Sequence, residues 1–119
     1  MVILNFGPPL FPAHLRQIQQ VTGEEVEQVL DVDVSGITDD RPLVSQVLGV
    51  LDQLGFTAAE WGRGSFLLHL PRSGALAATL LAAVAHRTNR FPRLVRAKPY
   101  GAVDVVDLQE LGTPSPRPA

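Results

Sequence analysis

Val2-Ile3-Leu4-Asn5-Phe6-Gly7-Pro8-Pro9, near the start of the chain, sets the class of fold. The first five of these residues form a nearly continuous apolar run, and a Gly-Pro-Pro corner closes it. A strand buried on both faces of a parallel sheet has this pattern, whereas a strand with one face in water alternates apolar and polar residues. We therefore predict a central parallel strand over residues 2–6.

The remainder of the chain alternates between helical and extended patterns. Residues 12–22 place apolar side chains at helical spacing and stop at Gly23, a favourable residue just past a helix end. Because a tight turn at 98–101 joins the last two strands, the fifth strand should run antiparallel to the fourth. The other predicted elements are strands over 29–34, 66–70, 93–98 and 102–108, helices over 42–54 and 73–88, and a capped turn over 57–61.

This order predicts an α/β fold in three layers, with a mostly parallel sheet of about five strands between helices. We expect one domain over residues 1–111 and a disordered, proline-rich tail over 112–119. Ligands of such sheets bind beyond the carboxyl ends of the strands. That edge would carry four loops, at residues 5–10, 35–39, 71–74 and 99–101.

The composition is that of a single globular domain, with 119 residues of which 45% are hydrophobic and 18% are charged. The chain has no cysteine, which suits a reducing compartment and leaves no thiolate for a metal site. Its first residues lack the basic region of a signal peptide, and its longest apolar run, residues 75–85, is too short to cross a bilayer. We therefore expect a soluble, cytoplasmic protein without a membrane partner.

Charge is sorted along the sequence, although the net charge is only −2. Residues 24–60 contain nine acidic side chains and a single basic one, Arg41. Residues 61–103 contain seven basic side chains and no acidic one. A positive half favours an anionic partner, and the alternative is that these cations only solvate one face.

The candidate ligand-binding residues lie in the four predicted loops: Asn5, Phe6, Gly7, Pro8, Ser35, Pro71, Arg72, Ser73, Gly74 and Tyr100. The first corner offers the amide of Asn5, the aromatic face of Phe6 and an open backbone at Gly7. The junction before the helix at 73–88 offers the cation of Arg72, a capping hydroxyl from Ser73 and free backbone amides. Together these groups favour a phosphate-bearing ligand.

Further cations lie at the opposite end of the same helix, at His86, Arg87 and Arg90. About 20 Å of helix, at 1.5 Å per residue, separates them from Arg72, so the two groups cannot easily share a pocket within one subunit. We keep these three residues as second-site candidates, although complementing the helix dipole is a sufficient role for them.

The helix at 73–88 is apolar nearly all round, because residues 75–85 contain only Ala, Leu, Val and one Thr. A helix that covers one sheet face of a monomer should carry a polar outer stripe. We therefore predict a homodimer, or a higher homo-oligomer, through this helix. The alternative is that the tail or the turn at Trp61 covers it.

The sequence carries no catalytic or cofactor signature: it has no phosphate-binding glycine loop, no zinc-protease motif and no hydrolase elbow. His14, His69 and His86 lie on different predicted elements without metal-ligand spacing, and a core or rim position explains His69. Asp31 and Asp33 alternate on the strand at 29–34, where a solvated strand face explains them. We therefore expect no catalytic residue, no metal and no cofactor.

Five short patterns stand in order along residues 2–111: VILNFGPPL at 2–10, QQVTG at 19–23, EW at 60–61, LP at 70–71 and HRTNRFP at 86–92. Together they resemble a group of small CRISPR-associated accessory proteins of type III systems, which have a Rossmann-like fold related to CARF domains. Gly7-Pro8 stands where we expect a polar pair in these relatives, which argues against a side-chain role there.

The resemblance implies a cyclic oligoadenylate ligand, above all cyclic tetra-adenylate, and no long nucleic acid. Such a ring is roughly two-fold symmetric, so a dimer with two copies of the same basic loops matches it. Binding would either sequester this messenger and damp type III signalling, or lead to cleavage by a ring nuclease with a 2′-hydroxyl as nucleophile. We favour sequestration, because the four loops hold no Lys, His or Tyr other than Tyr100. A protein-interaction module without a nucleotide ligand is the third alternative.

Overall fold

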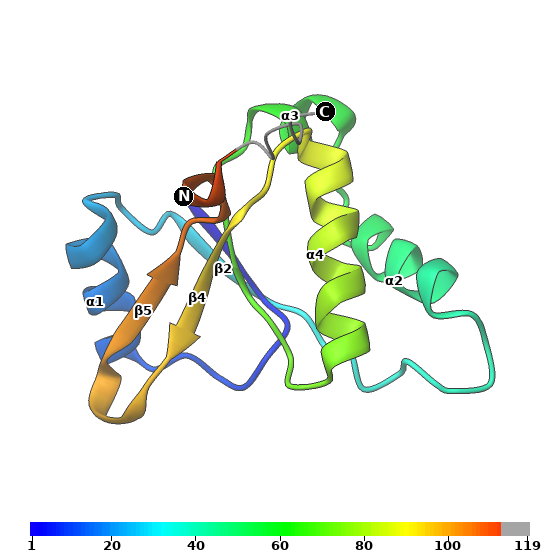
Figure 1. The fold of residues 1–119 in the computed structure, drawn as a ribbon, viewed down its shortest axis with the longest axis horizontal. Helices are drawn as coiled ribbons and strands as arrows, with labels where there is room; N and C mark the ends of the chain where they lie inside the picture. The colour runs from blue at the N-terminus through cyan, green and yellow to red at the C-terminus, as the bar shows by residue number, and fades with distance from the viewer. Residues whose placement is uncertain (113–119) are drawn as a thin grey trace, which may run out of the picture.

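The computed structural model describes residues 1–112, which form a five-stranded sheet with helices on both faces (Figure 1). The strand order is β2-β1-β3-β4-β5; the first four strands are parallel, and β5 is antiparallel to β4. The predicted α/β class is therefore confirmed, including its antiparallel last strand. The elements are β1 (Val2–Asn5), α1 (Pro12–Thr22), β2 (Gln28–Asp31), α2 (Leu43–Asp52), α3 (Ala58–Arg63), β3 (Phe66–His69), α4 (Gly74–Thr88), β4 (Arg93–Ala97), η1 (Pro99–Gly101), β5 (Val103–Val106) and η2 (Leu108–Leu111).

Residues 113–119 lie outside the described part of the chain, and with them nearly all of the predicted tail. Within residues 1–112, no helix is both long enough and apolar enough to span a membrane.

The two central strands, β1 and β3, feed two separate cores. On one face of the sheet, Ile3 and Leu67 pack with Ile18 of α1. On the other face, Leu4 and Leu68 belong to a larger core that α2, α3 and α4 complete. Figure 1 shows the same division, with α1 on one side of the sheet and α2 and α4 on the other. Because both faces of β1 and β3 are buried, their sequences are nearly continuous apolar runs.

Two helix boundaries follow local sequence signals. α1 has the predicted bounds, and Gly23 follows it with a φ of 68°, a left-handed conformation that favours glycine. α3 begins after Thr57, whose hydroxyl accepts a hydrogen bond from the Glu60 N–H (3.1 Å). The Glu60 carboxylate accepts one in return from the Thr57 N–H (3.0 Å), which completes a capping box.

The second strand ends earlier than predicted, at Asp31. The Val32 N–H still donates to the Asn5 carbonyl (2.8 Å), but the Asp33 carboxylate then accepts from the Ser35 N–H (2.8 Å). This side-chain bond forms a local turn in place of further strand pairing, and it lowers the pKa of Asp33. Asp31 and Asp33 therefore do not share a strand face, and the prediction that they do is wrong.

The fifth strand is also shorter than predicted, because it ends at Val106 and not at Leu108. The Asp107 carboxylate accepts a hydrogen bond from the Gln109 N–H (2.9 Å) and starts the short helix η2. An aspartate at this position caps a helix better than it continues a strand.

α4 buries one face, on which Leu76, Leu80, Val84 and Thr88 follow one another at four-residue spacing. α2 and α3 pack beside it, so part of the alternative explanation, cover by the turn at Trp61, is right. The exposed residues of α4 are Gly74, Ala75, Ala78, Ala82 and His86, and all of them except His86 are small and apolar. Residues 1–112 of a single chain therefore leave an apolar stripe of this helix in contact with solvent.

The basic stretch does not form one continuous positive surface, because acidic residues neutralise much of it. Ion pairs join Arg87 to Asp52 (2.8 Å), Arg93 to Glu24 (2.9 Å) and Arg96 to Asp104 (2.8 Å). Folding thus brings Asp52 and Glu24 of the acidic stretch, and Asp104 of β5, onto cations of the basic stretch. The four other cations of this stretch form no ion pair within residues 1–112: Arg63, Arg72, Arg90 and Lys98.

Candidate functional site

A cavity of about 570 Å³ opens at the carboxyl ends of β1, β3 and β4. The chain passes from β1 through α1 to β2 on one side, and from β3 through α4 to β4 on the other. The connections therefore diverge between β1 and β3, and such a switch point is where sheets of this class bind ligands. The lining residues are Pro8, Pro9, His14, His69, Leu70, Pro71, Arg72, Ala77, Leu94, Val95, Arg96, Ala97 and Lys98.

Asn5, the last residue of β1, is only 2% exposed and uses all of its hydrogen-bonding groups within the protein. Its Oδ1 accepts from the Gly7 N–H (3.0 Å) and from His69 Nδ1 (2.8 Å). Its Nδ2 donates to the Pro8 carbonyl (3.2 Å) and to the Asp31 carboxylate (2.9 Å). One side chain thus ties together the ends of β1, β2 and β3, which supports the floor of the cavity.

The same network fixes the tautomer of His69, which is 7% exposed. Because the Asn5 Oδ1 only accepts, Nδ1 of His69 carries the proton and Nε2 of the neutral ring carries a lone pair. Burial and, second, the nearby His14 ring lower the pKa of His69, while the Pro8 carbonyl opposes this shift. The ring is therefore neutral near pH 7 and offers the cavity a hydrogen-bond acceptor.

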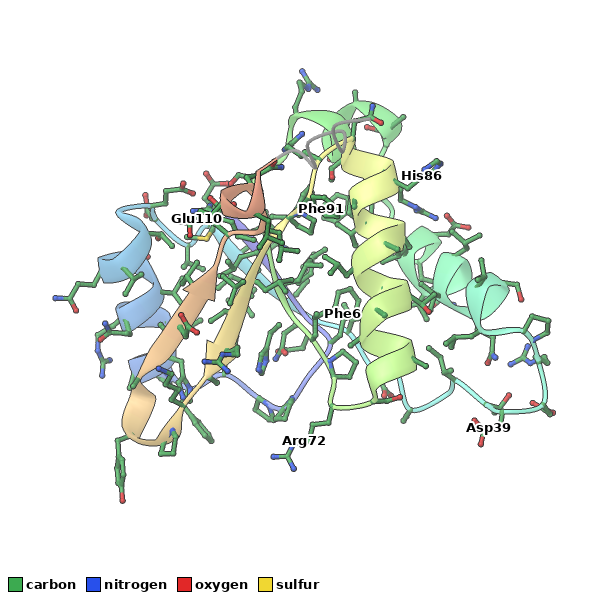
Figure 2. All side chains as sticks on the ribbon, in the orientation of Figure 1. Phe6, Asp39, Arg72, His86, Phe91 and Glu110 are labelled. Atoms are coloured by element: carbon green, nitrogen blue, oxygen red, sulfur yellow. The ribbon has the colours of Figure 1, made fainter. Side chains whose placement is uncertain are left out.

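Gly7 and Phe6 do not have the roles that we predicted for the first corner. A Cβ at residue 7 would lie 2.7 Å from the Leu70 carbonyl oxygen and 3.2 Å from the His69 ring, so the protein itself fills the space beside Gly7. Phe6 is buried in the larger core and lies between the sheet and α4, as Figure 2 shows. Its ring is thus not available for stacking on a ligand.

His14 lines the cavity too, but both of its ring nitrogens have partners. Nδ1 accepts a hydrogen bond from the Phe11 N–H (3.0 Å), so Nε2 carries the proton and donates to the Lys98 carbonyl (3.2 Å). His14 therefore closes the first turn of α1 and ties this helix to the end of β4. Its role is to hold the cavity wall in place.

Three cations line the cavity, and no carboxylate of residues 1–112 does. Arg96 is paired with Asp104 on the neighbouring strand, whereas Arg72 extends into solvent beside the first turn of α4 (Figure 2). Ser73 occupies the N-cap position, but its hydroxyl makes no capping hydrogen bond, so the predicted capping role is wrong. The backbone N–H groups in the first turn of α4 can therefore donate hydrogen bonds to solvent or to an anion.

The structure brings together only some of the predicted ligand-binding residues. Pro8, Pro71 and Arg72 line the cavity, and Asn5 and Gly7 lie directly beneath it. Ser73 and Gly74 follow Arg72 at the start of α4.

Two other predicted residues lie away from the cavity. Ser35 follows the edge strand β2 and does not line it. Tyr100 is fully exposed in η1, with a φ of 64°, and does not line it either.

Two of the three second-site candidates at the far end of α4 have structural partners. Arg87 pairs with Asp52 and lies over the Trp61 ring, 5.6 Å from its centroid. Arg90 donates to the carbonyls of Gly62 (2.9 Å), Gly64 and Thr88 (3.0 Å). His86 is exposed at this end of the helix, far from Arg72 (Figure 2).

Sequence reasoning missed the contribution of β4 to the cavity. Arg96 and Lys98 reach it because β4 is the parallel neighbour of β3, so both strands end at the same edge. The order of the strands was not predicted. Without that order, the sequence did not indicate that the basic end of β4 lies beside the cavity. His69 was assigned to the core or rim, and its buried position fits that assignment.

Within residues 1–112, no group of three or more His, Asp or Glu side chains gathers closely enough to hold a metal ion. A comparison of this chain with protein-family models, curated proteins and solved structures finds no match. The chemistry of the cavity is therefore the basis on which a function can be argued.

Proposed function

We propose that this chain binds a cyclic oligoadenylate, with cyclic tetra-adenylate as the expected ring, and sequesters it in the cytoplasm as an accessory protein of a type III CRISPR system. One observation carries the proposal: the switch-point cavity is lined by Arg72, Arg96 and Lys98, with no carboxylate from the described residues. Cations and free helix amides are the groups that bind phosphates best. Sequestration lowers the free concentration of the messenger and damps signalling.

The size of the cavity supports a site shared by two subunits. Its volume of about 570 Å³ suits one small ligand, since such pockets measure about 300–1,000 Å³. A ring of four nucleotides is larger than one such ligand. A two-fold dimer would offer the two-fold ring two copies of Arg72 and Lys98. We therefore include a homodimer in the proposal.

A ring nuclease is the second candidate, and His69 is the observation that favours it. In such a reaction Nε2 of His69 would take the proton of a 2′-hydroxyl as its oxygen attacks the adjacent phosphorus. The bond from phosphorus to the 5′-oxygen breaks, and that oxygen needs a proton from a second group. His14 is not free to supply it, because both of its nitrogens are engaged. Sequestration therefore remains our first proposal.

Incubation of the purified protein with labelled cyclic tetra-adenylate tests this choice. We expect tight, stoichiometric binding with little conversion over minutes, because a missing general acid typically costs about 10²–10⁴-fold in rate. Separation of bound, free and cleaved ring measures both quantities at once. Rapid multiple turnover would replace sequestration by the ring nuclease, and absence of binding would remove both.

Arg72→Ala should weaken the binding of cyclic tetra-adenylate by about 1–3 kcal/mol, the scale of a charge-assisted hydrogen bond. Arg63→Ala is the matched control, because Arg63 is also an exposed arginine but lies on α3 and does not line the cavity. Titration calorimetry at two salt concentrations would measure both variants, and the loss should shrink at high salt. If the two variants lost the same binding free energy, the ligand would be attracted by the positive charge of the whole surface and not by a specific pocket.

A further inference from the structure

We infer that His69 selects ribonucleotides over deoxyribonucleotides in this cavity, with its Nε2 accepting a hydrogen bond from a ribose 2′-hydroxyl next to a bound phosphate. This inference rests on the proposed function and deepens it, because it names the part of the nucleotide that the protein recognises beyond its charge. Three observations lead to it: the other polar side chains of the cavity, the fixed orientation of the ring, and the nearby cations.

Among the described residues, His69 is the only side chain lining the cavity that has an acceptor to offer. Arg72, Arg96 and Lys98 are donors only, and both nitrogens of His14 are used within the protein. The other lining side chains belong to Pro, Leu, Ala and Val. A ligand group that donates a hydrogen bond to a side chain of this wall therefore meets Nε2 of His69.

The ring of His69 is held in a single orientation. Nδ1 donates to Asn5 Oδ1 at 2.8 Å, and that oxygen is itself fixed by the Gly7 N–H and by the two bonds of the Asn5 amide nitrogen. Rotation of the ring by 180° would exchange this N–H donor for a carbon. The side chain is thus preorganised, so little rotamer entropy is lost when a ligand binds.

An unprotonated Nε2 among cations distinguishes between two kinds of ligand group. A phosphate oxygen has no proton to donate, so it binds Arg72 or Lys98 and avoids the lone pair. A hydroxyl can donate to that lone pair while its neighbouring phosphate is held by the cations. In a ribonucleotide the 2′-hydroxyl is adjacent to the 3′-phosphate, so the two groups arrive together. A deoxyribonucleotide leaves Nε2 facing a C–H group.

The adenine amino group is the other hydrogen-bond donor on the same ligand. Three cyclic tetranucleotides therefore have to be compared to tell whether His69 recognises the 2′-hydroxyl or the amino group. We would measure the affinity of the wild-type protein for cyclic tetra-adenylate, for its all-2′-deoxy analogue and for the cyclic tetramer of purine riboside, whose base has neither an amino group nor any other hydrogen-bond donor. The deoxy ring should bind about 5- to 150-fold more weakly, which is the effect of two neutral hydrogen bonds, one to His69 of each subunit. The purine riboside ring should bind as tightly as the adenylate ring.

Variants of His69 test whether this residue causes the preference for ribose. His69→Phe keeps a ring of similar size and leaves the Gly7 N–H on Asn5 Oδ1, and it should bind the ribose and deoxyribose rings equally. His69→Ala is a second variant with the same expected result, in case the larger ring does not fit. Arg72→Ala should weaken all rings while keeping the preference for ribose.

Five outcomes decide the inference. A loss of the ribose preference in either His69 variant supports it. Equal binding of the ribose and deoxyribose rings by the wild-type protein overturns it and leaves the proposed function standing. A preference that survives in both His69 variants, or one that follows the amino group, also overturns it. Failure of every ring to bind removes the proposed function itself.

Discussion

Replacement of Asn5 by leucine should lower the free energy of unfolding by about 3 kcal/mol, since each buried polar group left without a partner costs about 1–3 kcal/mol. Leucine has nearly the same shape as asparagine but no polar atom. It would leave the Gly7 N–H, the His69 Nδ1–H and the Pro8 carbonyl without the bonds that they now make. Urea denaturation followed by circular dichroism would measure the change.

Asp31→Asn is the matched control for this substitution. The new amide keeps an oxygen that can accept from Asn5 Nδ2, so only the charge is lost, and Asp31 is exposed. Its unfolding free energy should stay within about 0.5 kcal/mol of wild type, as is usual for surface substitutions. If Asn5→Leu proved as mild as this control, the network around Asn5 would not support the cavity as we describe.

The features that local sequence predicted are those whose causes are local. Gly23 ends α1, and Thr57 with Glu60 starts α3, because each signal acts within one turn of helix. The second strand ends at Asp31 and was predicted to be longer, because Asp33 continues the alternating apolar and polar pattern of residues 29–34. In the structure the Asp33 carboxylate accepts a hydrogen bond from the Ser35 N–H, and the chain turns there.

The floor of the cavity depends on contacts that sequence spacing does not reveal. Asn5 and His69 are 64 residues apart and meet only because β1 and β3 are neighbours in register. The loop containing Arg72 could be predicted, because a strand and a helix flank it in the sequence. Lys98 could not, since its place in the cavity depends on β4 lying beside β3.

The charge pattern illustrates the same limit. Seven cations without an intervening acid suggested a positive face, but Arg87, Arg93 and Arg96 pair with acids from other elements. Sequence shows which charges exist, whereas strand order and helix packing decide which of them remain unpaired.

Ala82→Glu should dissociate the proposed homodimer. Ala82 is exposed on α4 and borders two hollows, one with Val44 and Leu48 of α2 and the other with Phe91. These three side chains are 61%, 41% and 53% exposed, so they form an apolar surface that a second copy can cover. A glutamate there would bury an unpaired charge, which costs about 3–5 kcal/mol and exceeds what a modest interface can offset. Analytical ultracentrifugation at micromolar concentration would show the change in mass.

Gln20→Glu is the control for charge, because it adds the same group to an exposed position on α1, on the opposite side of the sheet (Figure 1). It should leave both the dimer and the affinity for cyclic tetra-adenylate unchanged. Ala82→Glu should weaken that affinity together with the dimer, because neither subunit then offers the second set of cations to the ring. A wild-type protein that sediments as a monomer yet binds the ring tightly would show that one cavity is sufficient, and the shared site would have to be abandoned.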